Sequence, residues 1–183
     1  MVRNPAQARR DVSEAGAPLI LTAELPPGLH RRFTALRSEH FPPERNHLEA
    51  HVTLFHALPP MCEGELRRLL GRLTAAMAPV GGRIEGIMPM GSGTAIRLAS
   101  HDLLMVRGDV AEHFHGMLTA QDSHNPRLHV TVQNKVTPAQ AKALQASLAP
   151  IILPERFKFP GLALHRYRGG PWEFVARWPF RGK

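Results

Sequence analysis

The stretch Ala50-His51-Val52-Thr53-Leu54 has a near copy further along the chain, Leu128-His129-Val130-Thr131-Val132. Both stretches are rich in β-branched and aliphatic residues, which favour β-strands. Because side chains alternate between the two faces of a strand, the histidine and threonine of each stretch share one face. The aliphatic residues share the other face. The sequence therefore predicts two strands that each present an imidazole and a hydroxyl. If the strands meet, they form a polar cleft with a dry floor.

Composition limits the class of protein. The chain has 183 residues and a formal net charge of +8, which fits one domain, or two small lobes that share a core. The positive charge favours an anionic partner such as nucleic acid or a nucleotide phosphate, although it is also compatible with a role in solubility alone. Cys62 is the single cysteine, so neither an intramolecular disulfide nor a cysteine-rich metal site is expected.

The N-terminal segment lacks the apolar core of a signal peptide, and no apolar run reaches the length of a membrane-spanning helix. We therefore expect a cytoplasmic protein that does not enter membranes. Residues 1–17 show no periodicity and are expected to form a flexible tail. The remaining residues, 18–183, are expected to form a single bilobal domain.

Hydrophobic periodicity, proline positions and capping signals predict the secondary structure. Gly91-Ser92-Gly93 is expected to be a hairpin turn, and Thr137-Pro138-Ala139-Gln140 is a capping box that opens a helix. Besides the two His-x-Thr strands, strands are predicted at 19–24, 83–88, 94–98, 103–106, 158–167 and 172–180, and helices at 63–77, 138–148, from Pro26-Pro27 onward and from Asp109 to about Leu118.

The order strand, helix, loop, His-x-Thr strand, helix occurs at 19–77 and again at 103–148. Such an internal duplication constrains the whole fold. It implies two lobes related by an approximate two-fold axis, each contributing one His-x-Thr strand to a central cleft. Periodicity alone predicts only a mixed α/β domain.

The paired His-x-Thr segments resemble the motifs of the 2H phosphoesterase superfamily, and within it the branch of 2′-5′ RNA ligase-like proteins and RNA 2′,3′-cyclic phosphodiesterases. The resemblance covers about residues 19–180. It implies an α+β fold in which two mainly antiparallel sheets line a central cleft and the helices lie outside. It also implies a monomeric, metal-independent enzyme without a cofactor.

The expected substrates are RNA ends or nucleotides with a 2′,3′-cyclic phosphate, hydrolysed to a 2′-phosphate. The reverse reaction, with a 5′-hydroxyl, would be 2′-5′ ligation. The motifs continue with Phe55-His56 and Gln133-Asn134, where close relatives often carry other residues. The choice among cyclic nucleotides, oligonucleotide ends and 2′-5′ linkages therefore stays open.

The four motif residues suit cleavage of a phosphodiester. One imidazole can be neutral and the other protonated near neutral pH, and hydroxyls can stabilise negative charge on the phosphate. The resemblance implies that His51 is the general acid toward the leaving ribose oxygen and that His129 activates water. Thr53 and Thr131 bind the phosphate. The two histidines can also exchange these roles, and half-buried structural histidines are the alternative interpretation.

Other candidates have weaker support. Arg166 and Tyr167, with Trp172 after them, can supply a cation for phosphate and a surface for base stacking, but hairpin packing explains Trp172 equally well. His113 and His115 diverge on a predicted helix, so no metal site is expected. The remaining histidines, His165 among them, show no partner pattern. A nucleotide-binding module without turnover and a metal-dependent hydrolase are the alternative functions.

Overall fold

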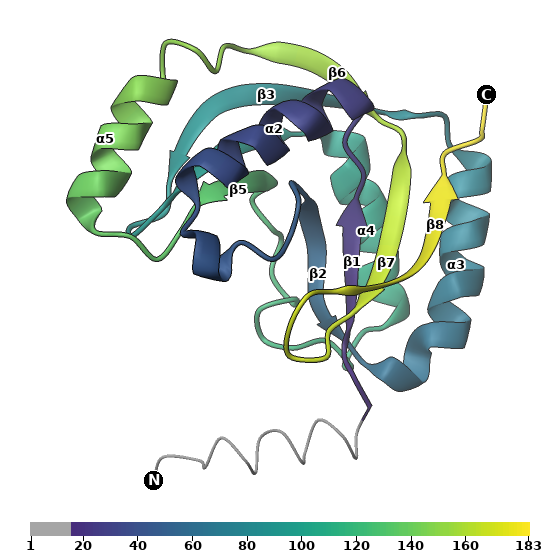
Figure 1. The fold of residues 1–183 in the computed structure, drawn as a ribbon. Coiled ribbons are helices and arrows are strands. Elements are labelled where there is room, and N and C mark those ends of the chain that lie inside the picture. The colour runs from purple at the N-terminus through teal and green to yellow at the C-terminus, as the bar shows by residue number, and fades with distance from the viewer. Residues whose placement is uncertain (1–15) are drawn as a thin grey trace, which may run out of the picture.

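The computed structural model describes residues 16–183, so positions 1–15 of the predicted tail lie outside the described residues. The chain forms two four-stranded sheets in which all strand pairs are antiparallel, and helices cover their outer faces (Figure 1). The strands are β1 (Leu19–Ala23), β2 (Val52–Leu58), β3 (Val80–Pro89), β4 (Thr94–Ala99), β5 (His129–Gln133), β6 (Glu155–Phe159), β7 (Gly161–Arg166) and β8 (Glu173–Pro179), and the helices are α2 (Pro27–His40), α3 (Glu63–Ala76), α4 (His101–His113) and α5 (Pro138–Leu148).

The two sheets have corresponding strand orders. Sheet A has the order β2-β1-β7-β8, and sheet B has the order β5-β4-β3-β6. Each His-x-Thr strand is therefore the edge strand of its sheet. The predicted α+β fold with two antiparallel sheets is confirmed. None of the helices in the described part of the chain has the length and apolar character that a membrane span requires.

Alternating side chains give each motif strand one apolar and one polar face. Val52, Leu54, Val130 and Val132 are buried, whereas the histidine and threonine side chains between them are only partly buried. The apolar faces of both sheets contribute to one connected core. Burial of these aliphatic side chains fixes which face of each edge strand points into the protein, because a slip of one residue would invert it.

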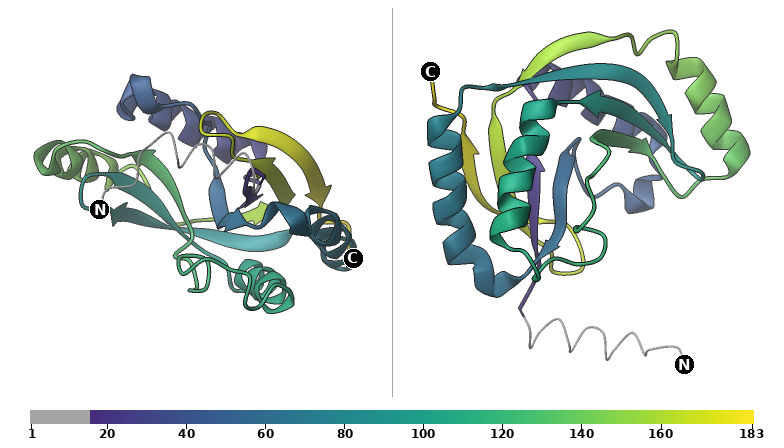
Figure 2. Two further views of the ribbon diagram at one scale, coloured as in Figure 1. Left: turned by 90° about the horizontal axis from the view of Figure 1, so that it is seen from below. Right: turned by 180° about the vertical axis from the view of Figure 1, so that it is seen from behind.

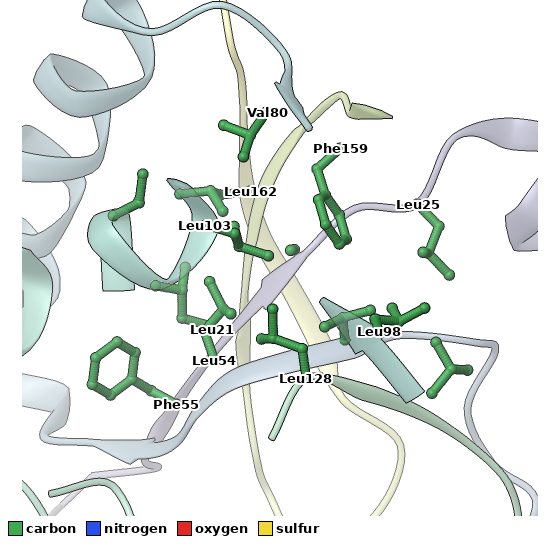
Figure 3. Packing of buried hydrophobic residues seen from close by; sticks show 14 of the residues in the cluster. Leu21, Leu25, Leu54, Phe55, Val80, Leu98, Leu103, Leu128, Phe159 and Leu162 are labelled. Carbon is green, nitrogen blue, oxygen red and sulfur yellow. The ribbon is translucent and has the colours of Figure 1, made fainter. Parts of the chain in front are cut away.

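The helix that precedes each motif strand contacts the other half of the molecule: α2 packs against β5 of sheet B, and α4, which packs mainly against β3 of sheet B, also reaches β2 of sheet A. The guanidinium of Arg107 on α4 lies 4.5 Å from the ring centroid of Phe55 on β2. Leu103 of α4 belongs to the same buried cluster as Leu21 and Leu162 of sheet A (Figure 3). Figure 2 shows α2 and α4 on opposite sides of the strands. The helices thus interlock the two halves of the chain.

The prediction of a strand at 103–106 and of a helix capped by Asp109 is wrong. These residues belong to α4, whose N-cap is Ser100; its hydroxyl accepts a hydrogen bond from the Leu103 N–H at 3.2 Å. Leu103, Val106 and Val110 are buried at helical spacing. A short apolar run does not distinguish a helix from a strand, which explains the error. The second repeat therefore begins at β4.

Other boundaries differ less. The predicted strand at 158–167 is divided at Pro160 into β6 and β7, because proline lacks the N–H that a continuous ladder needs. The hairpin at Gly91-Ser92-Gly93 is confirmed by a hydrogen bond from the Met90 N–H to the Gly93 carbonyl at 3.1 Å. The capping box at Thr137 and Gln140 is also confirmed.

Two substitutions in α4 test the corrected assignment. A strand would place residues 103 and 105 on one face, but in the helix Leu103 is fully buried and Met105 is 55% exposed. We expect Leu103→Ala to lower the free energy of unfolding by about 2–5 kcal/mol, because it leaves a cavity in the core. Met105→Ala should change it by less than about 0.5 kcal/mol. Urea denaturation measures both, and equal effects would contradict the assignment.

Candidate functional site

The structure brings the two His-x-Thr segments together. β2 begins at Val52, two residues later than the predicted stretch, so His51 lies directly before β2 and Thr53 lies within it, and His129 begins β5. The edge strands β2 and β5 contact each other. Thr53 and His129 line one cavity of about 570 Å³, and His51 lines a second cavity of about 480 Å³. The structure thus brings Thr53 of the first motif and His129 of the second to one cavity, whereas His51 lines the other cavity and Thr131 is not among the lining residues of either.

Both histidines are held by the same local hydrogen bond. Nδ1 of His51 lies 2.8 Å from the Glu49 carbonyl oxygen, and Nδ1 of His129 lies 2.6 Å from the Arg127 carbonyl oxygen. A carbonyl oxygen only accepts, so Nδ1 carries the hydrogen in both rings. In the neutral form Nε2 is then unprotonated. Each imidazole thus presents one nitrogen that can accept or return a proton.

His51 packs against an aromatic ring and lies near other basic side chains. The ring of Trp172 lies 4.6 Å from the His51 ring, centroid to centroid. Burial above all, together with the charges of Arg37, His165 and His129, lowers the pKa of His51 to about 4, against the opposing effect of the Glu49 hydrogen bond. His51 is therefore neutral at pH 7 in the free protein. The two equivalent histidines have different surroundings.

A buried arginine joins the two motif segments. Arg37 of α2 is 4% exposed; its Nε donates to the Leu48 carbonyl at 3.1 Å and its Nη1 to the Thr131 carbonyl at 2.7 Å. Its guanidinium also lies 4.3 Å from the Phe41 ring centroid. One rigid, planar cation thereby fixes the backbone that precedes His51 relative to the backbone of Thr131. Arg37 is not among the residues predicted from the sequence.

A second link comes from the loop that precedes β5. The buried carboxylate of Asp122 accepts hydrogen bonds from the backbone N–H groups of His56 and Ala57, both at 2.9 Å, and lies 3.2 Å from Nδ1 of His56. Burial opposes ionisation of Asp122, but these hydrogen bonds outweigh it, and the pKa is lowered. Asp122 therefore binds the exposed edge of β2. This role of Asp122 was not predicted from the sequence.

The cavity beside His51 has an aromatic wall. Nε2 of His165 lies 3.2 Å from the Thr22 hydroxyl oxygen, and the His165 ring lies 5.5 Å from Trp172 and 6.0 Å from Phe174. Burial lowers the pKa of His165. Phe174 is 57% exposed and lines this cavity together with Trp172 and His165. The predicted Trp172 surface is thus at the site, whereas His165 was missed.

Arg166 and Tyr167 lie elsewhere. The Arg166 guanidinium is 2.5 Å from a carboxylate oxygen of Glu63 and 2.8 Å from one of Glu173. Tyr167 is 43% exposed. Neither residue is among those that line the two cavities described above. Their predicted contact with substrate gains no support from the structure, and Trp172 is the aromatic residue that the fold brings to His51.

Residues 16–183 contain no group of three or more histidine, cysteine or acidic side chains placed to hold a metal ion. Of the predicted helical pair, His113 lies 2.7 Å from a carboxylate oxygen of Glu65, and His115 lies beyond the end of α4. Imidazoles, hydroxyls and arginines line the two cavities, together with the carboxylates of Glu24, Glu49 and Asp122. The imidazoles, hydroxyls and arginines can transfer protons and stabilise an anion.

Removal of the Arg37 side-chain donors should destabilise the fold. Arg37→Met leaves the Leu48 and Thr131 carbonyls without their cationic donor, and the expected loss in free energy of unfolding is about 3 kcal/mol. Arg31→Met, on the exposed face of the same helix, is the matched control and should cost less than about 0.5 kcal/mol. Urea denaturation measures both. Equal stability of the two variants would show that Arg37 does not join the segments.

Comparison with known proteins identifies a family and similar folds. The family model for the 2′-5′ RNA ligase superfamily matches residues 25–171. The structure is similar to that of TT0787 of Thermus thermophilus, with a TM-score of 0.62, 16% identity and coverage of 91% of this chain and 99% of that chain. It is also similar to E. coli LigT complexed with NADP+, with a TM-score of 0.60, 17% identity and coverage of 90% and 98%. LigT complexed with 3′-AMP gives a TM-score of 0.60 at 16% identity, again with coverage of 90% and 98%. No curated protein matches the chain.

Proposed function

Because the chain belongs to the 2′-5′ RNA ligase superfamily, we propose that it is a metal-independent phosphodiesterase. Its substrate is a 2′,3′-cyclic phosphate, on an RNA end or a nucleotide, and its product is a 2′-phosphate. The observation that carries the proposal is the matched pair of imidazoles. His51 and His129 lie at the start of two contacting edge strands, and each is fixed through Nδ1 so that Nε2 is free.

The proposed reaction is an in-line displacement at phosphorus. His129 accepts a proton from water through Nε2 while the water oxygen forms a bond to phosphorus. The bond from phosphorus to the ribose 3′-oxygen breaks, and His51 donates a proton from Nε2 to that oxygen. The products are a 2′-phosphate and a 3′-hydroxyl. The hydroxyls of Thr53 and Thr131 donate to the non-bridging oxygens as their negative charge increases.

The aromatic wall supports a nucleoside phosphate as the ligand. LigT has been crystallised with 3′-AMP and with NADP+. In this chain, the Trp172 and Phe174 side chains line the cavity beside His51 and provide flat apolar surfaces for a base. With a 5′-hydroxyl in place of water, the same groups would carry out 2′-5′ ligation. Hydrolysis is the expected direction because water is the more abundant nucleophile.

The first experiment measures hydrolysis of a nucleoside 2′,3′-cyclic phosphate in the presence of a chelator. We expect turnover by the wild type, and a loss of at least about 100-fold in kcat for His51→Ala and for His129→Ala, because each removes a proton-transfer group. Thr53→Val and Thr131→Val should reduce kcat by less. Chromatography identifies the product as the 2′-phosphate.

The outcomes separate the candidate functions. Loss of turnover on adding the chelator would support a metal-dependent hydrolase and contradict the two-histidine mechanism. A wild-type protein that binds the nucleotide without converting it would instead be a binding module. Arg166→Ala is a control outside the cavities and should retain wild-type kcat.

The low pKa of His51 has a consequence for its role as the acid. An acid must be protonated before transfer, whereas the free protein keeps His51 neutral at pH 7, since its pKa is about 4. A phosphate anion near Nε2 stabilises the imidazolium form and raises the pKa. Substrate binding is thus proposed to bring a proton to His51. The positive charges around the ring are then matched by the ligand.

Proton uptake by His51 can be measured directly. We expect NMR titration of the His51 ring to give a pKa near 4 in the free protein and a pKa raised to about 6 or above with a nucleoside 2′-phosphate bound. Affinity for this product should accordingly increase as the pH falls toward 5. If the His51 ring stays neutral at pH 5 in the complex, the assigned roles are wrong and His129 is the acid.

A further inference from the structure

A row of cationic side chains begins next to His129 and crosses the polar face of sheet B. Residues directly opposite on neighbouring strands share a face, as do residues two apart on one strand. His129 on β5 pairs with Arg97 on β4, and Ala99, two residues later, pairs with Arg83 on β3. Arg83 in turn pairs with Arg156 on β6. All these side chains therefore lie on the same face as the His129 imidazole.

We define the basic track as Arg97, Arg83, Arg156 and Lys158. Lys158 lies two residues beyond Arg156 on β6 and hence on the same face. From His129 on β5 to the end of the track on β6, three strand spacings are crossed, about 14 Å in total, a length that a few nucleotides can span. At its far end Arg83, Arg156 and Lys158 line a cavity of about 800 Å³, in which Asp102 is the only carboxylate among the lining residues.

The charge of the track is not balanced within the protein. Arg83 and Arg97 share the carboxylate of Glu85, at 2.5 and 3.6 Å, and their side chains remain 55% and 52% exposed. No carboxylate of residues 16–183 lies within 4.0 Å of the charged nitrogens of Arg156 or Lys158. Arg83 and Arg156 also repel each other as like charges on directly opposite residues. An anionic ligand would remove this repulsion.

The corresponding face of sheet A has a different character. There Arg177 forms an ion pair with Glu24 at 2.7 Å, and the cavity wall is made by His165, Trp172 and Phe174. One side of the cleft is therefore aromatic with a paired charge, and the other is cationic. Aromatic surfaces suit a base, whereas a row of arginine and lysine suits phosphates.

We propose that the basic track binds the phosphodiester backbone of an RNA chain whose cyclic-phosphate end lies between His51 and His129. The inference rests on the proposed function and makes it more specific, because the substrate is then an RNA end rather than a free cyclic nucleotide. The terminal nucleoside lies against the aromatic wall of sheet A. The preceding phosphates follow the polar face of sheet B toward Arg156 and Lys158.

The test compares two substrates, a short single-stranded RNA ending in a 2′,3′-cyclic phosphate and a nucleoside 2′,3′-cyclic phosphate. The variant is Arg156→Gln combined with Lys158→Gln. We expect kcat/KM for the RNA to fall about tenfold at moderate salt, mainly through KM, and the slope of log KM against log salt to become shallower by about 1.4, for two lost contacts to a single strand. Hydrolysis of the nucleoside substrate should not change, which also shows that the variant is folded.

The matched control removes the same charge elsewhere. Arg68→Gln combined with Arg72→Gln affects two exposed arginines of α3 and should leave the RNA kinetics unchanged. An equal loss for both substrates, or an equal loss in the control, would overturn the track. If the wild type hydrolyses neither substrate, the proposed function fails on its own. Fluorescence anisotropy with a 2′-phosphorylated RNA then decides: weaker binding by the track variant alone supports the track, and unchanged binding contradicts it.

Discussion

The cleft between the two motifs depends on one buried cation. Two separate sheets must present their edge strands to each other, and no backbone ladder joins these sheets within residues 16–183. Arg37 supplies the missing connection, because its guanidinium donates to the Leu48 carbonyl on one side and to the Thr131 carbonyl on the other. A lysine could not reproduce this arrangement, since its single ammonium group lacks the fixed fork geometry of arginine. The position of the two histidines relative to each other follows from this contact.

The loop before β5 makes the reciprocal connection. Asp122 binds the backbone N–H groups of His56 and Ala57 on the free edge of β2. An uncovered strand edge tends to pair with other chains, so this carboxylate both closes the edge and ties the second half of the molecule to the first. Arg37 of the first half of the chain thus binds the second half, and Asp122 of the second half binds the first. They explain how an approximately duplicated chain forms one cleft.

Part of this arrangement could be predicted from the sequence. The alternation in the two His-x-Thr segments identified the motif strands, and local signals such as the capping box at Thr137 identified α5. The position of Arg37 in the sequence is also informative, because it lies four residues after Phe33 on the apolar face of a predicted helix. An arginine at such a position needs buried hydrogen-bond partners. Its partners are distant in sequence, however, so no local pattern could name them.

The other omissions have related causes. The role of Asp122 comes from a loop that crosses to another sheet, and His165 reaches the site only because β7 pairs with β1. Arg166, the neighbour of His165, was the expected phosphate ligand, but strand alternation turns it away toward Glu63 and Glu173. A shift of one residue along a strand exchanges the two faces. Sequence proximity to a site therefore does not decide which of two neighbours contacts it.

The pseudo-symmetry of the fold does not extend to its electrostatics, and this difference is what the proposed chemistry requires. Two histidines with identical surroundings would have equal proton affinities, and nothing would favour one as the acid and the other as the base. Here both imidazoles keep the same hydrogen bond through Nδ1. His51, however, packs against Trp172 near the buried charge of Arg37, whereas His129 lies opposite Arg97 on an exposed face. The duplicated backbone sets the geometry, and the residues around it distinguish the two histidines. In the proposed mechanism, the phosphate anion between the two rings favours the protonated form of His51.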